Sequence, residues 1–336
     1  YKTVFAQENA DAFCLNVCTV KGDSTALQLL RKIQNANSSA PILLTGCIPP
    51  DFEQKLLLEN SNVSLANLDV LRKNPDLLNE WLKGNGFREN LKEKTPRIFT
   101  PGMAQESPHI GILNISDGCL DACSFCSTRL VKGKHRSVSP EKILSEAKRY
   151  LENGCKELWL TGQDTSCYGF DIGTNLAELA KKILEQNSGD YKIRLGMGNP
   201  RHLEKYLDEM LSVYEDDRIY KFIHLPVQSG SDPVLQAMGR KHNVNTFRKM
   251  AEAFISKFSY FTLSTDIIVG FPGETREDFE QTCKLISDLK PSICNITRFV
   301  ARPNTVAEKL PNKIPGKEQH YRSATLSELF QKIALE

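Results

Sequence analysis

The sequence predicts an α/β protein with two domains: a doubly wound parallel sheet, followed by an open, partial TIM-like barrel. Three observations favour this fold class. The chain has 336 residues, a length more typical of two domains than of one. Short apolar runs of strand length alternate with helix-length amphipathic stretches, and strands separated by helices form parallel sheets. A charged, proline-containing stretch at 92–106 separates two such series.

The first domain is expected over residues 1–95, with a linker at 96–108. Apolar strand-like runs at 12–16 and 41–45 flank a helical stretch at 24–35. This strand–helix–strand order predicts parallel pairing in a flavodoxin-like sheet. Such sheets bind ligands beyond the carboxyl ends of their strands, so residues that follow the two runs are candidates for a site.

The second domain is expected over residues 109–305, with a C-terminal tail at 306–336. Six strand-like runs with a helical stretch between each pair predict six βα units of an open barrel: 109–116, 156–161, 192–196, 222–227, 261–269 and 293–299. Ser139-Pro140-Glu141 predicts one helix start, and Thr275 with Asp278 resembles a capping box at another. Parallel barrels carry their sites at the C-terminal strand ends, so the loops after these runs are where chemistry is expected.

Three cysteines follow the first of these runs in a Cys-x3-Cys-x2-Cys spacing: Cys119, Cys123 and Cys126. Three thiolates can ligate three corners of a [4Fe–4S] cluster and leave the fourth iron open for a substrate or cofactor. No Cys-x2-Cys or His-x3-His pair follows to close a structural zinc site, so the alternative is a zinc site completed from elsewhere in the fold. Ten cysteines in 336 residues are too sparse for a disulfide framework.

This spacing, with an aromatic residue just before the last cysteine, resembles the signature of the radical S-adenosylmethionine (SAM) superfamily. Further motifs resemble those of the methylthiotransferases in order and spacing, and they lie at 160–165, 224–230, 265–275 and 302–305, with 16–20 and 45–47 before them. Residues 163–175 and 194–197 are most similar to the archaeal and eukaryotic branch. That branch acts on N6-threonylcarbamoyladenosine at position 37 of tRNA.

The resemblance implies a role for each motif. Cys119, Cys123 and Cys126 would hold a cluster whose open iron takes the amino and carboxylate groups of SAM, and electron transfer would cleave SAM to a 5′-deoxyadenosyl radical. The other expected cofactor-binding residues follow strands: Phe125 against adenine, Gly162 and Gln163 near the methionine amino group, Gln228 and Ser229 after the fourth strand, and Ile268 and Gly270 beside adenine. Core packing is the alternative for Phe125, and loop ordering is the alternative for Gln228.

Methylthiolation needs a sulfur source, and the resemblance implies a second, auxiliary [4Fe–4S] cluster in the first domain. Cys18 and Cys47 match two of its three ligands. The third is expected upstream of Tyr1, so this chain, which begins without an initiator methionine, is expected to have lost its true start. Cys14, on an apolar strand, is expected to be a buried thiol rather than a ligand. The remaining cysteines are expected to be structural: Cys155, Cys167, Cys283 and Cys294.

A formal net charge of +2 means that any nucleic-acid surface must be a local patch. A basic run without acidic residues follows the cysteines and suits phosphates at the barrel mouth: Arg129, Lys132, Lys134, His135 and Arg136. A solvated cationic face is the alternative. Members of the family carry a small β-barrel RNA-binding domain, which is expected beyond Glu336. Asn304 replaces the glycine usual in the 302–305 motif, and asparagine tolerates a positive φ there.

The sequence therefore predicts a tRNA methylthiotransferase that uses SAM as methyl donor and radical source and that depends on an electron donor and a sulfur source. The alternatives are methylthiolation of isopentenyladenosine-37 or of a ribosomal protein, and a non-catalytic iron–sulfur or zinc protein that binds RNA. No run approaches the roughly 18 apolar residues of a membrane span, and no signal peptide is recognisable. Unpaired thiols favour the reducing cytoplasm.

Overall fold

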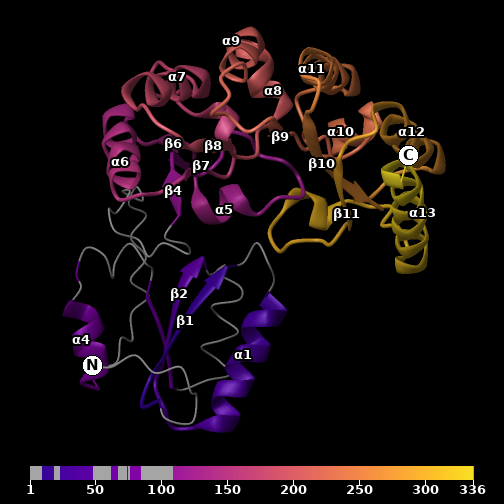
Figure 1. The fold of residues 1–336 in the computed structure, drawn as a ribbon. Coiled ribbons are helices and arrows are strands. Elements are labelled where there is room, and N and C mark those ends of the chain that lie inside the picture. Colours follow the sequence, from indigo (N-terminus) through magenta and orange to yellow (C-terminus); the bar gives the residue numbers. More distant parts are fainter. Residues whose placement is uncertain are drawn as a thin grey trace. The chain divides into compact units, whose positions relative to one another are not determined.

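The computed structural model describes residues 10–18, 23–47, 62–66, 74, 76–84 and 109–335. The chain divides into two compact units, the first extending to Arg97 and the second comprising Ile98–Arg129 and Gly133–Glu336 (Figure 1). Each unit has its own cluster of buried apolar side chains. Two cores in one chain agree with the two hydrophobic series in the sequence.

The first unit contains a parallel sheet in the order β1-β2-β3, formed by β1 (Phe13–Cys18), β2 (Ile42–Cys47) and β3 (Val63–Leu65). Helix α1 (Asp23–Ala36) connects β1 to β2, and α4 (Asp76–Leu82) buries Trp81. The strand–helix–strand prediction is confirmed. Strand β3 was not predicted, because three residues with a polar one among them make no recognisable apolar run.

In the described part of the second unit, 109–335, six parallel strands form two sets. The first set, in the order β4-β7-β8, comprises β4 (Ile110–Asn114), β7 (Glu157–Thr161) and β8 (Lys192–Leu195). The second set, in the order β11-β10-β9, comprises β9 (Phe222–His224), β10 (Thr262–Val269) and β11 (Ile293–Arg298). The sets meet where Ile193 bridges Ile219 and where the Gly198 amide donates to the His224 carbonyl at 2.9 Å. The six predicted strands are thus confirmed in their predicted order.

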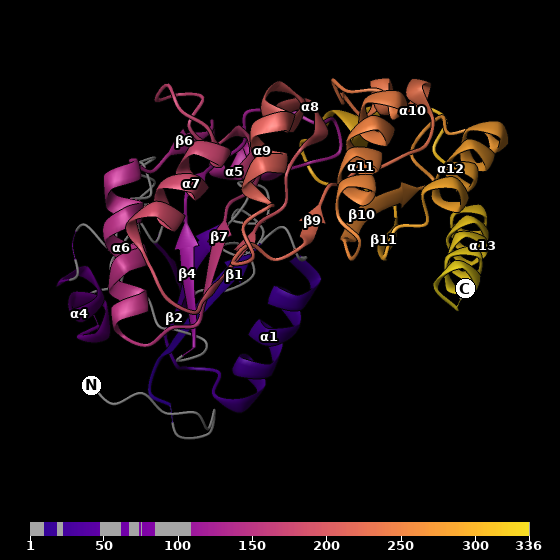
Figure 2. The same ribbon diagram turned by 45° about the horizontal axis from the view of Figure 1, so that its top comes forward.

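Helices lie along the outer side of these strands in both views (Figures 1 and 2). The longer ones are α6 (Pro140–Glu152), α7 (Leu176–Gln186), α9 (Leu207–Val213), α11 (Val244–Lys257), α12 (Arg276–Leu289) and α13 (Gly316–Leu335). The short ones are α5 (Thr128–Lys132), α8 (Pro200–Leu203) and α10 (Asp232–Ala237), with 3₁₀ turns η2 (Thr165–Cys167), η3 (Glu204–Tyr206) and η4 (Val306–Lys309). A small antiparallel ladder, β5 (Ser116–Asp117) with β6 (Arg136–Ser137), was not predicted.

Alternation along β10 separates the two faces of the barrel wall. Leu263, Ile267 and Val269 belong to the main core, against the helices. Successive side chains of a strand point to opposite faces, so Asp266 and Ile268 face the barrel interior. The interior of this open barrel is therefore partly polar, which is where a polar substrate can enter.

The predicted helix start and turn signals are confirmed. Pro140 opens α6 with Ser139 at the N-cap, although the Ser139 side chain makes no capping hydrogen bond. At α12 the capping box is complete: the Asp278 amide donates to Thr275 Oγ1 at 3.1 Å, and the Thr275 amide donates to Asp278 Oδ2 at 2.9 Å. Asn304 has φ of +63°, the backbone conformation expected for the residue that replaces glycine.

The C-terminal helix α13 is attached to the barrel by a buried ion pair. Arg322 Nη1 donates to Glu274 Oε2 at 2.8 Å and to the Glu274 carbonyl at 2.9 Å. Both side chains are almost fully buried. The Gly270 amide also donates to Glu274 Oε2, at 2.6 Å, so the pair ties α13 to the end of β10.

None of the helices in the described ranges combines the length and the hydrophobicity that crossing a bilayer takes.

Candidate functional site

Cys119, Cys123 and Cys126 lie on one loop that distant segments hold in place. Gly118 begins the loop with φ of +76°, and a Cβ there would collide with the Lys134 carbonyl. Further along, the Ser124 amide donates to the Met238 carbonyl at 2.8 Å, and the Ala307 amide donates to the Ser124 carbonyl at 2.8 Å. The loop is therefore pinned between the end of α10 and the start of η4.

The three thiols are free and half-buried. Arg240 Nη1 donates to Cys123 Sγ at 3.6 Å, and the Cys126 thiol donates to Thr128 Oγ1 at 3.1 Å. Burial, with the nearby Asp164 charge, raises the pKa of Cys119 to about 12. Burial also raises the pKa of Cys123, against the opposing charge of Arg240. Iron binding would therefore release thiol protons from this loop.

Within the described residues, no three His, Cys, Asp or Glu side chains are arranged to hold a single metal ion. A four-iron cluster spreads its thiolates over several metal atoms, and three free thiols on one loop supply the ligand type that such a cluster uses. The donor set of the loop therefore fits an iron–sulfur cluster.

Two orphaned polar atoms adjoin the end of β7. Ser116 Oγ and Gln163 Oε1 are buried and have no hydrogen-bond partner among the described residues. Gly162 lies between them: a Cβ on Gly162 would come within 2.8 Å of Ser116 Oγ. Buried acceptors without donors are costly unless a ligand satisfies them.

Gln228 and Ser229 follow β9 but differ in their environments. Gln228 has φ of +83°, an unusual value for a residue with a side chain, and its amide donates to the Asp266 carbonyl at 2.9 Å. Such strain often marks functional sites. Ser229 is fully buried, lies 3.3 Å from Thr282 Oγ1 and accepts from the Ser231 amide. These contacts of Ser229 order the loop, and its contact with a cofactor stays a prediction.

Phe125 and Ile268 pack, half-buried, on the same small apolar cluster, formed by Val234, Met238, Phe271, Phe299 and Ala307. Both side chains thus lie where an adenine ring could contact them, and core packing accounts for part of the surface of Phe125. The Gly270 amide is already used by Glu274, and the Gly270 carbonyl accepts from Gln319 Nε2 at 3.2 Å. Only the second lone pair of that carbonyl remains for a ligand.

The basic run after the cysteines divides between surface and interior. Lys134 and Arg136 are exposed, Lys132 is half-buried, and Arg129 donates from Nη1 to the Leu120 carbonyl at 2.9 Å. His135 does not belong to this surface, which corrects the sequence-based assignment. The β5–β6 ladder turns its ring inward, where Nε2 lies 3.0 Å from Ser137 Oγ and Nδ1 lies 3.3 Å from Cys167 Sγ.

A buried network around Asp121, in the middle of the cysteine loop, was not predicted. Asn199 Nδ2 donates to Asp121 Oδ2 at 2.6 Å, and Arg201 Nη1 donates to Oδ1 at 2.5 Å. His202 Nε2 lies 3.2 Å from the same carboxylate. Burial alone would raise the pKa of Asp121, but His202 and Arg201 hold that pKa below its usual value. The network fastens the cysteine loop to the loop after β8.

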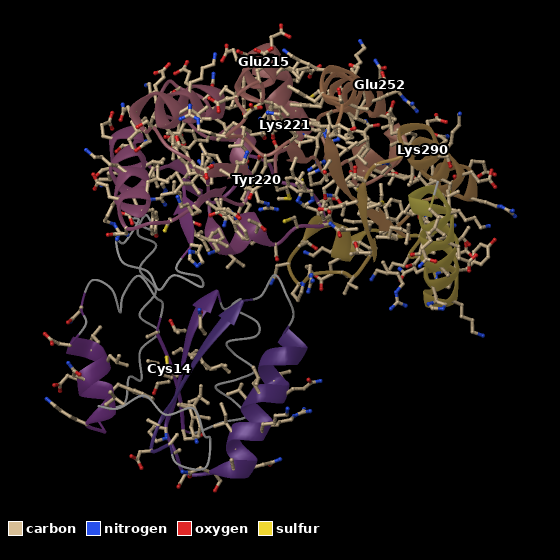
Figure 3. The ribbon with its side chains drawn as sticks, viewed as in Figure 1. Cys14, Glu215, Tyr220, Lys221, Glu252 and Lys290 are labelled. Atoms are coloured by element: carbon tan, nitrogen blue, oxygen red, sulfur yellow. The ribbon has the colours of Figure 1, made fainter. Side chains whose placement is uncertain are left out.

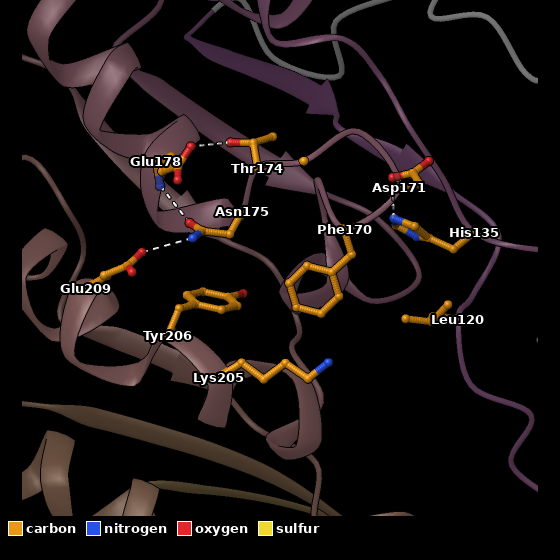
Figure 4. A pocket seen from close by; sticks show the side chains of 11 residues that line it. Leu120, His135, Phe170, Asp171, Thr174, Asn175, Glu178, Lys205, Tyr206 and Glu209 are labelled. Carbon is orange, nitrogen blue, oxygen red and sulfur yellow. Dashed lines mark hydrogen bonds and ion pairs between the residues drawn. The ribbon is translucent and has the colours of Figure 1, made fainter.

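An open groove of about 660 Å³ lies beside Leu120, on the outer side of the cysteine loop (Figure 4). Its polar side chains are bonded to one another: Thr174 Oγ1 donates to Glu178 at 2.6 Å, and Asn175 Nδ2 donates to Glu209 at 2.9 Å. Lys205 Nζ lies 4.8 Å from the centre of the Phe170 ring. The carboxylates of this groove are thus already paired with neighbouring groups.

In the first unit, β1 and β2 end side by side at two cysteines. Cys18 and Cys47 are Cα partners in the parallel register, at the carboxyl ends of both strands. Their side chains lie outside the described part of the structure. Cys14 is exposed rather than buried, which corrects the prediction (Figure 3). Alternation places it on the face opposite to Phe13 and Leu15, which pack in the core.

The other cysteines have the surroundings of structural thiols. Cys155 and Cys167 are buried, and Cys283 and Cys294 pack partly against the main core. Burial, with the charges of Asp164 and Cys119, raises the pKa of Cys167 far above its usual value.

Comparison with known proteins adds sequence relatives. The sequence model of the radical SAM superfamily matches residues 113–286. A probable threonylcarbamoyladenosine tRNA methylthiotransferase of Pyrococcus horikoshii is 36% identical over the whole chain, which covers 79% of that protein. One from Archaeoglobus fulgidus is 38% identical over 98% of the chain and 77% of its own length. The threonylcarbamoyladenosine tRNA methylthiotransferase of Homo sapiens is 34% identical over 98% of the chain and 58% of its own length.

Solved structures resemble the fold at lower identity. The radical SAM methyltransferase TsrM of Kitasatospora setae, solved with cobalamin and a [4Fe–4S] cluster, aligns with a TM-score of 0.56 at 12% identity, over 84% of this chain and 59% of that one. The cobalamin-dependent SAM radical enzyme OxsB aligns with a TM-score of 0.55 at 15% identity, over 95% of this chain and 47% of that one. The expected barrel architecture is thereby confirmed.

Proposed function

Because this chain belongs to the radical SAM superfamily and, within it, to the threonylcarbamoyladenosine tRNA methylthiotransferases, we propose that it attaches a methylthio group to C2 of N6-threonylcarbamoyladenosine at position 37 of tRNA. The observation that carries this proposal is the combination of three free thiols on one pinned loop with the orphaned acceptors beside Gly162. The same reaction on isopentenyladenosine-37 or on a ribosomal protein is the second candidate.

The superfamily works with SAM and a [4Fe–4S] cluster, and the methylthiotransferases use a second cluster as the source of sulfur. We assign Cys119, Cys123 and Cys126 to the first cluster and Cys18 and Cys47 to the auxiliary one. When bound, the first cluster supplies the electron that cleaves SAM to a 5′-deoxyadenosyl radical. Gly162 and Gln163 would bind the methionine amino group, and Phe125 and Ile268 would contact the adenine of SAM.

We also assign a role to each range of the chain. Residues 1–95 would hold the auxiliary cluster, residues 96–108 would link the domains, and residues 109–305 would form the radical SAM domain. The remaining tail, 306–336, would lead toward an RNA-binding domain. An electron donor and a sulfur source would act on the clusters, and the cytoplasm, where thiols stay reduced, would be the place of action.

Mass spectrometry of tRNA nucleosides from a strain lacking this gene tests the proposal. We expect the 2-methylthio derivative of threonylcarbamoyladenosine to disappear and its precursor to accumulate. The full-length gene should restore the methylthio nucleoside, whereas a Cys123→Ala gene should not. An unchanged nucleoside profile in the deletion strain would refute this function.

Arg240 is expected to raise the reduction potential of the cluster. Its guanidinium donates to Cys123 Sγ and is held by the Pro226 carbonyl at 2.7 Å, so a positive charge faces a cluster ligand. Hydrogen bonds and positive charge near cluster sulfur favour the reduced state. We expect Arg240→Gln to lower the midpoint potential by about 59 mV, which is a tenfold change in a one-electron equilibrium. Potentiometric titration followed by electron paramagnetic resonance measures it.

Arg248→Gln is the matched control, because Arg248 pairs with Asp288 on the outer helices. Its midpoint potential should equal that of the wild type. Equal potentials in all three proteins would show that Arg240 does not act on the cluster.

The basic residues that follow the cysteines are expected to bind phosphates of the anticodon arm of tRNA. If Arg129, Lys132, Lys134 and Arg136 contact phosphates, each alanine substitution should reduce the slope of log affinity against log salt by roughly 0.7 to 0.9. The measurement is the affinity of full-length protein for tRNA at a series of salt concentrations. Cleavage of SAM without tRNA should stay unchanged.

Lys148→Ala and Lys182→Ala, on the outer helices α6 and α7, serve as controls for this series. Their salt slopes should match that of the wild type. A quadruple alanine variant with an unaltered slope would mean that the basic run is a solvated face, whereas lost SAM cleavage would place it in the cofactor pocket.

A further inference from the structure

Three polar side chains from three adjacent strands meet inside the barrel: His224 of β9, Asp266 of β10 and Asn295 of β11. His224 Nε2 lies 2.9 Å from Asp266 Oδ1, and Asn295 Nδ2 donates to the same oxygen at 2.8 Å. Asp266 and Asn295 are direct partners in the parallel register. The strand pairing itself therefore brings this trio together.

The trio faces the interior of the barrel. The neighbours of Asp266 along β10 show this, since Thr265 and Ile267 are fully buried on the opposite face. The side chains of His224 and Asp266 keep 20% and 26% of their surface exposed, and Asn295 is exposed. A molecule inside the barrel can thus reach all three.

The trio leaves several acceptors unused. Burial raises the pKa of Asp266, but hydrogen bonds from His224 and Asn295, with the nearby Arg240 charge, hold that pKa below its usual value, so Asp266 is a carboxylate. If His224 Nε2–H donates to Asp266, the neutral ring presents Nδ1 as an acceptor. Asp266 Oδ2 and Asn295 Oδ1 are two more acceptors, and neither has a partner within the described residues. Such an array of acceptors attracts N–H donors.

We propose that His224, Asp266 and Asn295 bind the exocyclic N–H donor of the adenosine that is to be modified. The inference rests on the proposed function and specifies where its substrate base is read. Asp266 lies two residues before Ile268 on the same face of β10, so the base bound by this trio is next to the apolar contact assigned to SAM. SAM also carries an adenine amine, and the experiment separates the two sources.

The test compares the affinity of holoenzyme for two anticodon stem-loops, one with adenosine and one with purine riboside at position 37. The two RNAs differ only by the exocyclic amine. Wild type should bind the adenosine stem-loop about tenfold more tightly than the purine riboside stem-loop. A factor of about ten corresponds to one good hydrogen bond to a charged acceptor. Asp266→Asn, which replaces an acceptor by a donor in the same shape, should bind both equally. The comparison forms a double-mutant cycle that isolates this contact.

Asp288→Asn is the matched control, since its carboxylate has 32% exposure and pairs with Arg248 on the outer helices. It should keep the tenfold preference. Asn295→Ala, on the edge strand β11, is a second variant that leaves the contact between His224 and Asp266 intact, and it should lose part of the preference. Thermal melting establishes that each variant is folded.

A second arm measures SAM binding and deoxyadenosine formation without RNA. Both should be within twofold of wild type in Asp266→Asn. Lost SAM binding in this variant would assign the trio to the adenine of SAM and overturn the proposal. A wild type that binds both stem-loops equally would also overturn it, while leaving the proposed function standing. A wild type that binds neither stem-loop would overturn this reading of the trio, and the nucleoside profile of the deletion strain tests the proposed function separately.

Discussion

Alanine in place of Cys119, Cys123 or Cys126 is expected to abolish reductive cleavage of SAM. Two thiolates cannot hold a four-iron cluster that keeps one iron open, so each single substitution removes the whole reaction rather than a part of it. The loop itself should persist, because backbone hydrogen bonds of Ser124 to α10 and η4 hold it without the thiols. Deoxyadenosine formation and iron content of the anaerobically reconstituted protein measure the effect.

Cys283→Ala is the control for these variants. Cys283 lies on α12 and packs partly against the main core, so its loss should leave iron content and deoxyadenosine formation unchanged. Deoxyadenosine production at the wild-type rate by any of the three loop variants would contradict the ligand assignment. A single zinc in place of iron would favour the non-catalytic binding protein instead.

Arg322→Met is expected to cost about 3–5 kcal/mol of folding free energy, the usual effect of leaving one partner of a buried ion pair alone. Glu274 would then be a buried carboxylate without its cation. Urea denaturation of the second unit measures the loss. Arg276→Met is the control: its pair with Glu280 at 3.1 Å is largely exposed, and its loss should cost under about 1 kcal/mol.

The loss of folding free energy in Arg322→Met should depend on pH. Burial already raises the pKa of Glu274 while Arg322 is present, and removal of Arg322 would raise it further. A carboxyl whose pKa is higher in the folded state gains stability as pH falls, because folding then takes up a proton. The deficit should therefore be smaller at pH 5 than at pH 8. A cost no larger than that of Arg276→Met, with no pH dependence, would contradict this account of α13.

The sequence predicted the larger elements because each leaves a local signal. The strand-like runs at 109–116, 156–161 and 261–269 contain β4, β7 and β10, and the Thr275 capping box formed as expected. The strands β3, β5 and β6 were missed, since two or three residues show no periodicity.

The cysteine loop was predictable because its three ligands fall within eight residues of one another. The network around Asp121 was not, since it joins that loop to Arg201, 80 residues away in sequence. The trio of His224, Asp266 and Asn295 depends in the same way on strand register. The exposure of Cys14 depends on which face of β1 it occupies, and the burial of His135 goes with its contacts to Ser137 and Cys167; composition determines neither.

The most direct test supplies reconstituted full-length protein with SAM, a reductant and tRNA that carries threonylcarbamoyladenosine at position 37, followed by mass spectrometry of the nucleosides. The account predicts a 2-methylthio product with two SAM molecules consumed: one leaves S-adenosylhomocysteine after methyl transfer, and the other leaves 5′-deoxyadenosine. tRNA with unmodified adenosine or isopentenyladenosine at that position should give little product. A methylthio product on isopentenyladenosine alone, or no cleavage of SAM by protein with intact clusters, would contradict the account.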